Sequence, residues 1–392
     1  MKLTVVADSL LYKTSSGTYW CESIYGYDFW ERYLMTFSEV EIVSRTKTVS
    51  DDEVKGMIRV DGDNISIKQL PYTRGMSDYI KKYFEIRKQI KKIIIDSECA
   101  IIRLPSIVAD MFLKEYKKTG KLFFLEIVAD PYDAYSFNKI AKYYFSYRLK
   151  KSVLQADGVS YVTEYYLQSK YPPKTKQITT HYSTINLLEE HFSELNSYSI
   201  DMNRPIKLIH VANSMSNNIK GHDIAIKVVN YILSNGYQCE ITFIGDGPYK
   251  AYLKDLIIKY KIEDHVNFVG KLSDSNQIRN YLKQSDLFLF PTKAEGLPRA
   301  LIEAMAIGLP SISTPVNGVP ELLEDRYLFN PLNVEDFGNK VISLINNPEE
   351  LKEMSNNNII TAYKYKYKNL EKKRIDFYEK LHILVKNRNK KG

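Results

Sequence analysis

The sequence has little cysteine. Its 392 residues include only three, Cys21, Cys99 and Cys239, and their wide separation fits no spacing of a zinc or redox site. Cys99 and Cys239 fall in apolar runs that are typical of strands, where a buried free thiol is ordinary. We therefore expect reduced thiols in the core and no disulfide framework.

Long hydrophobic runs are also missing. No stretch approaches the roughly 18 consecutive apolar residues that a membrane-spanning helix needs. The first apolar run, Leu3–Ala7, stops at Asp8 and has the pattern of a strand rather than of a secretion signal. These features predict a cytoplasmic protein.

A strong charge excess is absent as well. The net charge is +8, and residues 1–190 hold 28 Lys and Arg against 24 Asp and Glu, so neither half is basic enough for a nucleic-acid-binding domain. The small excess suits a polyanionic acceptor or an anionic membrane surface. No Gly-x-Gly-x-x-Gly follows a first strand in either half, which argues against a nicotinamide oxidoreductase.

What the chain does contain is a regular alternation of short apolar runs and amphipathic stretches. This alternation predicts parallel sheets with helices on both faces, and the length suits two domains. The segment 186–205 is polar and ends at Pro205, so we expect it to connect the two domains. We predict an N-terminal Rossmann-like domain at 1–190, a linker at 191–205, a second Rossmann-like domain at 206–362, and a C-terminal helix with a basic tail at 363–392.

The expected elements can be given by residue. In the first domain we expect strands at Leu3–Ala7, Val40–Ser44, Ala100–Leu104, Leu122–Val128 and Gly158–Val162, and helices at Tyr25–Phe37, Asp78–Ile95, Ser106–Lys118 and Asn138–Leu154. In the second we expect strands at Ile206–Ala212, Glu240–Ile244, Val266–Val269, Leu287–Phe290 and Ser311–Ser313, with helices from Lys220, Tyr249, Asn276 and Leu297, and a helical tail at Leu351–Lys386.

The most informative stretch follows the strand Leu287–Phe290. A polar loop there leads into a helix expected to begin near Leu297, with Pro298 in its first turn, where the missing N–H is harmless. The free N–H groups of that first turn form an anion site suited to phosphate, and Gly296 allows the backbone to approach a ligand closely.

Two carboxylates bracket this predicted phosphate site. Glu295 lies in the loop and Glu303 lies about two turns into the helix. Carboxylates in these positions can accept hydrogen bonds from sugar hydroxyls, including those of a ribose. A pair of solvated glutamates is the alternative, and the Gly-Leu-Pro between them in a strand–loop–helix context argues against it.

This segment, continued through Gly308-Leu309-Pro310 and Gly318-Val319-Pro320-Glu321-Leu322, resembles the signature of glycosyltransferase family four. The resemblance covers nearly the whole chain and is strongest in 206–325. It implies the GT-B fold, with two Rossmann-like doubly wound α/β domains facing across a cleft and a C-terminal helix that packs back on the N-terminal domain.

The resemblance also implies a donor site. The turn that holds Gly245 and Gly247 would lie beneath the nucleotide, the backbone around Val269 would read the base, and Lys220 would bind the donor pyrophosphate. Many members of the family carry an arginine shortly before that lysine. Here the stretch 212–219 has none, and a small polar residue, Ser214, takes its place among the predicted donor contacts.

By resemblance, the reaction is a sugar transfer with retention and with neither a metal nor a cofactor. Lys220 and the helix start at Gly296, Leu297 and Pro298 would meet the negative charge of the leaving diphosphate. Glu295 would hold hydroxyls of the transferred sugar and Glu303 those of the ribose. We favour a UDP-sugar over a GDP-sugar as the donor.

The N-terminal domain is expected to bind the acceptor. Gly17 lies in a polar loop where the family has a glycine-rich turn near the donor phosphates. Asp130 follows the strand Leu122–Val128 and could accept the acceptor's proton, or it could cap the loop. Glu126 is a weaker candidate for the base, and His181 is expected to be structural.

One further segment suggests a membrane. The predicted helix Asp78–Ile95 is basic and amphipathic, so it either covers the core with a solvated face or docks on an anionic bilayer. The sequence thus predicts a hexosyltransferase that acts on a glycan or lipid-linked acceptor, in capsule or cell-surface polysaccharide synthesis. The alternatives are a sugar-nucleotide 2-epimerase of the same fold and a degenerate scaffold subunit.

Overall fold

A computed structural model describes residues 1–201, 203–272 and 274–390. Position 202 of the predicted linker and positions 391–392 of the predicted basic tail lie outside the described residues. The chain divides into two compact units. The first unit holds Met1–Val162, Leu167–Tyr182 and Glu371–Gly392, and the second holds Thr163–Tyr166 and Ser183–Leu370.

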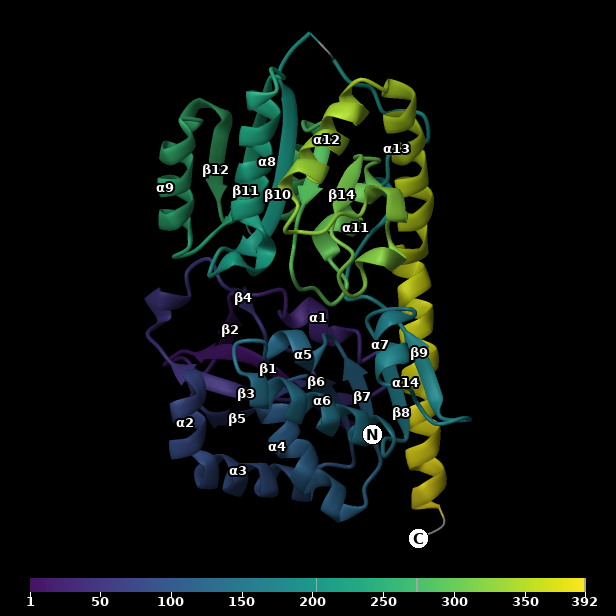
Figure 1. Cartoon of the computed structure of the whole chain (residues 1–392). Helices are drawn as coiled ribbons and strands as arrows, with labels where there is room; N and C mark the ends of the chain where they lie inside the picture. The colour runs from purple at the N-terminus through teal and green to yellow at the C-terminus, as the bar shows by residue number, and fades with distance from the viewer. Residues whose placement is uncertain (202, 273, 391–392) are drawn as a thin grey trace. The chain divides into compact units, whose positions relative to one another are not determined.

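The first unit is built on a nine-stranded sheet (Figure 1). The main path runs β4-β2-β1-β6-β7-β8-β9, while β3 pairs with β1 and β5 pairs with β3. All pairs are parallel except those of β2 with β1 and with β4. The strands are β1 Lys2–Lys13, β2 Tyr19–Cys21, β3 Glu39–Thr48, β4 Ile58–Arg59, β5 Ile65–Pro71, β6 Cys99–Leu104, β7 Phe123–Ile127, β8 Gly158–Tyr161 and β9 Ile178–His181.

The helices of this unit begin where side chains can cap them. The Ser106 hydroxyl accepts from the Ala109 N–H at 3.1 Å at the start of α4, and the Asn138 amide oxygen does the same for α6. These two helices confirm the predicted ones. The helices are α1 Tyr27–Glu31, α2 Gly75–Lys81, α3 Tyr83–Asp96, α4 Ile107–Tyr116, α5 Pro131–Ala134 and α6 Lys139–Val153, followed by α7 Tyr166–Lys170.

Two helix predictions were wrong in extent. The predicted single helix Asp78–Ile95 is divided into α2 and α3 at Lys82, whose φ of −96° and ψ of 9° leave the α region. The predicted helix Tyr25–Phe37 keeps only α1, because the chain after Glu31 continues in turns that bury Tyr33 and Phe37. Burial of large aromatic side chains outweighs helix propensity at that point.

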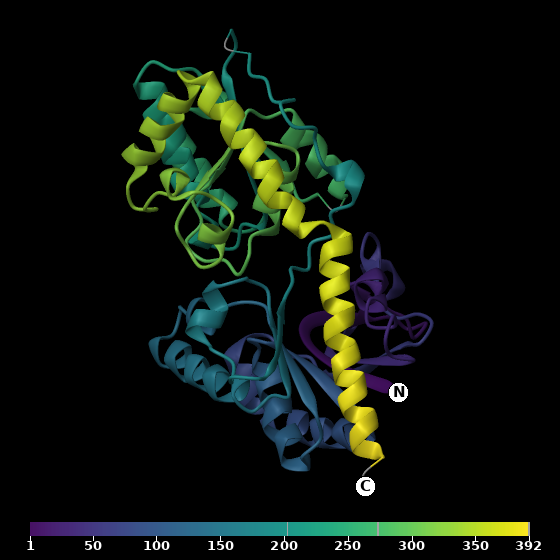
Figure 2. The same cartoon turned by 90° about the vertical axis from the view of Figure 1, so that its right-hand side faces the viewer.

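The last helix, α14 (Tyr367–Asn389), joins the first unit from Glu371 onward (Figure 2). Its Tyr378 hydroxyl donates to the buried carboxylate of Glu126 at 3.0 Å, as do Tyr33 at 3.1 Å and Tyr182 at 2.9 Å. Arg103 completes the set with an ion pair to Glu126. A buried carboxylate is tolerated only with such partners, and the predicted return of the C-terminal helix to the N-terminal domain is confirmed.

The second unit is a five-stranded parallel sheet in the order β12-β11-β10-β13-β14. The order reverses between β10 and β13, the place where open α/β sheets bind ligands at their carboxyl ends. The strands are β10 Ile206–Ser214, β11 Cys239–Asp246, β12 Val266–Gly270, β13 Leu287–Phe290 and β14 Ser311–Ser313. The helices are α8 His222–Ser234, α9 Lys250–Tyr260, α10 Ser275–Lys283, α11 Arg299–Ala306, α12 Val334–Ile345 and α13 Pro348–Ala362.

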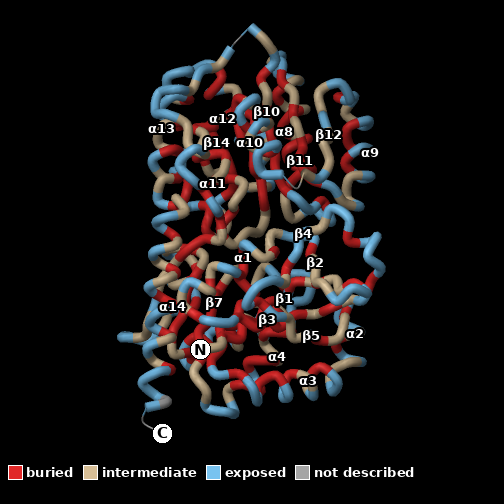
Figure 3. Tube along the Cα trace, turned by 180° about the vertical axis from the view of Figure 1, so that it is seen from behind, coloured by how far each residue is buried: buried red, intermediate tan, exposed pale blue. Residues whose placement is uncertain are grey.

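Each unit has its own apolar interior (Figure 3). In the second unit one buried cluster joins β10 and β11 to α8, α12 and α13. The three cysteines are free and buried, as the sequence predicted. Over the described part of the chain, no helix is long and apolar enough to cross a membrane.

Candidate donor-binding site

Lys220 lies on a loop that the structure holds in place. The loop follows β10, and Lys220 ends a short 3-10 turn, Asn218–Lys220, in which the Asn217 side chain accepts from the Ile219 N–H at 3.0 Å. Gly221 has a φ of +73°, and a Cβ there would lie 1.9 Å from the Pro291 carbonyl oxygen. Only glycine fits between this loop and the segment after β13.

The same packing brings Lys220 to Glu295. The Lys220 ammonium donates to Glu295 Oε1 at 2.6 Å, and the Thr292 hydroxyl donates to that oxygen at 3.1 Å. The Lys220 side chain is 31% exposed and that of Glu295 is 10% exposed, so the pair is only partly screened by solvent. No described residue donates to the second oxygen, Glu295 Oε2, which leaves it available to a ligand hydroxyl.

The loop that carries Glu295 and Gly296 is fixed from the other side too. The Asn317 amide donates to the Glu295 carbonyl, and the Gly318 N–H donates to the Gly296 carbonyl at 3.2 Å. Sequence reasoning assigned no role to Asn317 or Thr292. The Asn317-Gly318 pair, with Asn317 at a φ of +49°, is a turn signal that could have located the first of them.

Helix α11 begins two residues later than predicted. Pro298 lies outside the helix as its N-cap, with a ψ of 106°, and Arg299 is the first helical residue. A residue before proline is sterically disfavoured in the helical region, which is consistent with Leu297 lying outside the helix. No side chain caps this end, so the first N–H groups of α11 have no partner within the helix.

Glu303 lies on α11 with its side chain partly buried. No hydrogen bond or ion pair joins its carboxylate to another described residue. Desolvation by burial raises the pKa of Glu303, and the nearby Arg299 and Arg279 partly offset that effect. An acceptor that lacks a protein donor is suited to a hydroxyl supplied by a ligand.

The turn after β11 packs tightly against the end of β10. Gly245 and Gly247 have φ values of +137° and +154°, and a Cβ on Gly245 would lie 1.9 Å from the Ala212 carbonyl oxygen. Ser214 is exposed, pairs with Asp246 in the sheet, and donates to the Ser216 hydroxyl at 3.0 Å. Both strand ends therefore come to the same edge as the Lys220 loop.

Val269 lies on β12, one strand further out. Its side chain is partly exposed, and it is followed by Gly270 at a φ of +92°. Next to it, Phe268 stacks on Phe243 with ring centroids 5.4 Å apart and lies under the Lys250 ammonium. The strand end thus brings a partly exposed residue beside an aromatic surface.

Comparisons with known proteins give the class of this protein. Residues 201–360 match the family described as glycosyl transferases group 1. Protein CapJ of Staphylococcus aureus is 29% identical over 341 residues, which is 86% of this chain and 84% of CapJ. The chain is a glycosyltransferase with the GT-B fold. The amylovoran biosynthesis glycosyltransferase AmsK of Erwinia amylovora is 36% identical over 129 residues, and that alignment spans 31% of AmsK.

Solved structures agree on the fold of this glycosyltransferase. Sucrose-phosphate synthase from Thermosynechococcus elongatus has a TM-score of 0.73 at 13% identity, over 98% of this chain and 100% of that one. Anabaena Alr3699/HepE in complex with UDP-glucose has a TM-score of 0.68 at 13% identity, over 97% and 100%. At this identity the likeness concerns the fold alone.

Two buried histidines lie behind the Lys220 loop of the glycosyltransferase, and sequence reasoning passed over them. The His210 and His222 ring centroids are 4.4 Å apart, and His210 Nε2 lies 2.7 Å from the Lys220 carbonyl oxygen. Both nitrogens of His222 are buried without a hydrogen-bond partner among the described residues. Desolvation lowers the pKa of His210 to about 4 and that of His222 to about 2, so both rings are neutral at pH 7.

The predicted residues of the first unit have mainly structural contacts. Gly17 has a φ of +86° in the turn after β1, where the Ser15 and Ser16 hydroxyls donate to Asp51. His181 Nε2 lies 2.6 Å from the Lys373 ammonium. Glu126, the weaker candidate for the base, is buried under the three tyrosines described above.

Asp130 has the contacts of a cap. Its carboxylate is buried and accepts from the Tyr132 N–H at 2.9 Å, from the Tyr171 hydroxyl at 2.5 Å and from the Lys170 ammonium at 2.5 Å. These contacts make it the N-cap of α5. The geometry favours the capping alternative over the role of catalytic base, and we assign the base role to no residue.

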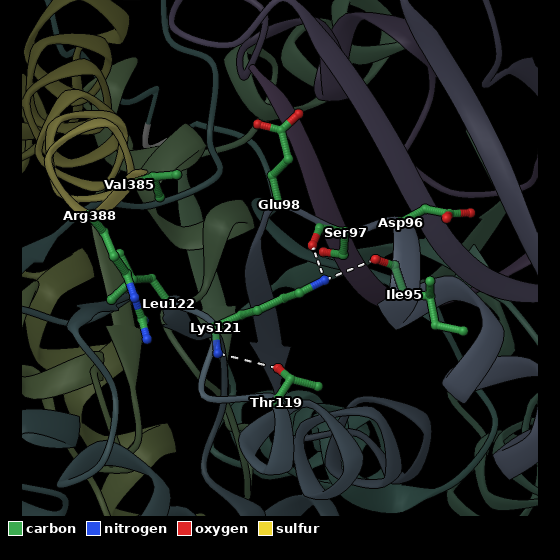
Figure 4. Close-up of a pocket in the computed structure, with 9 residues that line it drawn as sticks. All are labelled: Ile95, Asp96, Ser97, Glu98, Thr119, Lys121, Leu122, Val385 and Arg388. Carbon is green, nitrogen blue, oxygen red and sulfur yellow. Dashed lines mark hydrogen bonds between the residues drawn. The ribbon is translucent and has the colours of Figure 1, made fainter. Parts of the chain in front are cut away.

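A polar hollow of about 380 Å³ lies at the far end of the first unit's sheet (Figure 4). The Lys121 ammonium reaches into it and donates to the Ile94, Ile95 and Ser97 carbonyls at 2.6–3.0 Å. Lys121 therefore caps the end of α3, and the hollow is structural. Within the described ranges, no group of three or more His, Cys, Asp and Glu side chains could hold a metal ion.

Proposed function

We propose that this glycosyltransferase is a retaining hexosyltransferase of family four. It moves a sugar from a nucleotide-diphosphate sugar to a hydroxyl of a glycan or lipid-linked acceptor. The relatives AmsK and WcaL are named for the biosynthesis of amylovoran and colanic acid, which supports a role in bacterial surface polysaccharide synthesis. Alr3699/HepE and TarM are described in complex with UDP, which supports a UDP-sugar as the donor.

The observation that carries the proposal is the ion pair between Lys220 and Glu295. At 2.6 Å it holds the ammonium against the loop that leads into α11, a helix whose start has no side-chain cap. A preorganised cation and aimed N–H groups stabilise the charge that develops on a leaving diphosphate, in the manner of an oxyanion site. The leaving group can then depart without a bound metal.

The surroundings of the other predicted residues suggest the role of each in binding the donor. Glu295 Oε2 accepts from hydroxyls of the transferred sugar, and Glu303 accepts from the ribose. The backbone around Val269 contacts the base, and the glycines at 245 and 247 let the nucleotide approach the sheet edge. Ser214 stands where an arginine would add a charged contact, which lowers the affinity for the diphosphate.

The experiment is a thermal-shift series with UDP, GDP, ADP and CMP, with and without EDTA. A ligand at about 100 times its Kd adds roughly 2.7 kcal/mol, which is visible as a shift of a few degrees. We expect UDP to stabilise the protein, EDTA to have no effect, and Lys220→Ala and Glu303→Ala to abolish the shift.

Transfer then separates the candidate activities. Sugar transfer from the UDP-sugar that depends on an added acceptor identifies a transferase, and an α-linked product from an α-linked donor identifies retention. Interconversion of the donor without an acceptor would indicate an epimerase. Failure of every nucleotide to bind would indicate a scaffold subunit. We place the enzyme at the cytoplasmic face of the membrane, where lipid-linked acceptors are elongated.

A further inference from the structure

Helix α6 carries an exposed aromatic and aliphatic face. Ile140 is 82% exposed, and three tyrosines, Tyr143, Tyr144 and Tyr147, are more than half exposed. These positions recur at intervals of three or four residues, so they share one side of the helix. Leu149 is buried on the opposite side and packs the helix against the first unit.

The same helix is basic without any acidic residue. Arg148 forms an ion pair with Asp110 of α4 at 2.9 Å, and the Lys142 ammonium lies 4.0 Å from the Tyr132 ring centroid. The remaining three, Lys139, Lys150 and Lys151, are exposed and form no ion pair with another described residue. Cations flank the apolar face at both ends.

A second exposed face lies on α2 and α3. Ile80 and Phe84 are 72% and 77% exposed, and Ile86, Ile90, Ile93 and Ile94 hold α3 to the core. Exposed lysines of α3, Lys88, Lys91 and Lys92, form no ion pair with another described residue. The predicted basic amphipathic character of this segment is thus present, although a break at Lys82 divides it.

The two faces border one groove. α3 and α6 both attach to α4, through the Arg87–Glu115 and Arg148–Asp110 ion pairs, and all three helices belong to the first unit (Figure 1). The groove between them has a volume of about 480 Å³, and its lining is mostly apolar. Its apolar lining includes Met76, Ile80, Phe84, Met111, Tyr144 and Phe145, and the two ion pairs also lie in its wall.

We propose that α3, α6 and this groove form a docking surface for an anionic lipid bilayer. Tyrosines partition to the level of the lipid headgroups, exposed Ile and Phe side chains enter the acyl boundary, and unpaired lysines attract anionic headgroups. Charge decides the occupant, since both carboxylates in the groove lining are ion-paired, while α3 and α6 on either side carry exposed lysines that form no ion pair with another described residue. The inference rests on the proposed function in one respect, because a lipid-linked acceptor would lie in the same bilayer.

The test is sedimentation of the full chain with vesicles of phosphatidylcholine alone and of phosphatidylcholine with about one third phosphatidylglycerol. We expect binding only to the anionic vesicles and weaker binding at high salt. Lys139→Glu/Lys151→Glu and Ile140→Ser/Tyr147→Ser should each lower the partition coefficient roughly tenfold or more. A matched control, Lys254→Glu/Lys259→Glu on α9 of the second unit, reverses two exposed lysines and should bind like wild type.

Three results would overturn the docking surface. The first is equal binding to neutral and anionic vesicles, and the second is wild-type binding by both α6 variants. The third is a loss of binding in the α9 control as large as that in the α6 variants. A dimer in sedimentation velocity that both α6 variants abolish would assign the face to a second copy of the chain instead. The thermal shift with UDP must stay unchanged in the α6 variants, and its absence in wild type would contradict the proposed function while leaving the vesicle result intact.

Discussion

At the scale of single residues, the candidate donor site combines one paired carboxylate and one that has no partner among the described residues. Glu295 is neutralised by Lys220 at 2.6 Å, whereas Glu303 has no partner among the described residues and its pKa is raised by desolvation. Stability and function therefore oppose each other at Glu303. A carboxyl group whose pKa rises on folding destabilises the native state as the pH climbs above the ordinary range of glutamate.

Glu303→Gln should expose this opposition. Glutamine cannot ionise, so the variant should have a higher free energy of unfolding than wild type at pH 7 and should lose this gain near pH 4. The glutamine side chain offers the ribose hydroxyls a neutral amide oxygen in place of a charged carboxylate, so UDP affinity should fall about tenfold or more. Thermal melts at both pH values and a UDP titration measure the two effects. A variant that is less stable than wild type at pH 7 would contradict the burial argument.

The buried histidine pair gives a pH dependence of opposite sign. Folding lowers the pKa of His210 to about 4 and that of His222 to about 2, so the unfolded chain binds protons that the folded chain does not. Stability should therefore fall as the pH drops from about 6.5 towards 4, by up to about 1.4 kcal/mol per pH unit for each ring.

His222→Phe tests the sign. Both His222 nitrogens lack hydrogen-bond partners among the described residues, so phenylalanine removes the titration without removing a hydrogen bond. Urea unfolding between pH 7 and pH 5 should show a shallower loss of stability than in wild type. His210→Phe should flatten the slope as well, but it also removes the contact to the Lys220 carbonyl and should weaken UDP binding. If both variants lost unfolding free energy with falling pH as steeply as wild type, groups other than these two histidines would cause the acid sensitivity.

At the scale of elements, the turn after β11 depends on glycine. Gly245→Ala would place a Cβ 1.9 Å from the Ala212 carbonyl oxygen at a φ of +137°, and should cost about 3 kcal/mol through overlap and backbone strain. Gly236→Ala is the matched control, because its φ is +85° with nothing within 4 Å. The control should cost only about 1 kcal/mol. Equal losses in urea unfolding would mean that the turn relaxes around the new methyl group.

Most strands that the sequence predicted are largely buried, although β12, which was also predicted, is only partly buried. β13 is an uninterrupted apolar run, and β6 and β7 are apolar apart from Arg103 and Glu126, because neither face of these strands meets solvent. β5 mixes exposed and buried residues, and β4 has two exposed ones, so their patterns did not stand out from loops. Pairing to a neighbouring strand, rather than local pattern, makes them strands.

The candidate site residues stand in local sequence motifs, whereas part of the surrounding fold has no local signal. Lys220, Glu295 and the glycines at 245 and 247 follow from short motifs, because backbone geometry and charge set which residue types fit. The Glu126 cluster could not be predicted, since it joins Tyr33, Arg103, Tyr182 and Tyr378 across most of the chain. Contacts over such distances leave no local periodicity.

At the scale of the whole molecule, the chain ends inside the unit where it begins. The core of the second unit closes without any residue beyond 370, whereas the first unit buries Phe377, Tyr378, Leu381 and Val385 of α14. The two units should therefore depend differently on the last helix. Loss of Tyr378 also removes one donor from the buried Glu126 carboxylate, worth about 1.5–3 kcal/mol.

Truncation after Leu370 should consequently unfold or strongly destabilise the first unit while the second still binds UDP. Calorimetry should show that the transition of the first unit is lost or moved to lower temperature, and that UDP still raises the remaining transition. Tyr378→Phe keeps the helix and removes only the hydroxyl, so it should lower the first unit's transition by a few degrees. If truncation instead removed the response to UDP, α14 would be required to fold the donor-binding unit, and the two units could not be independent in folding.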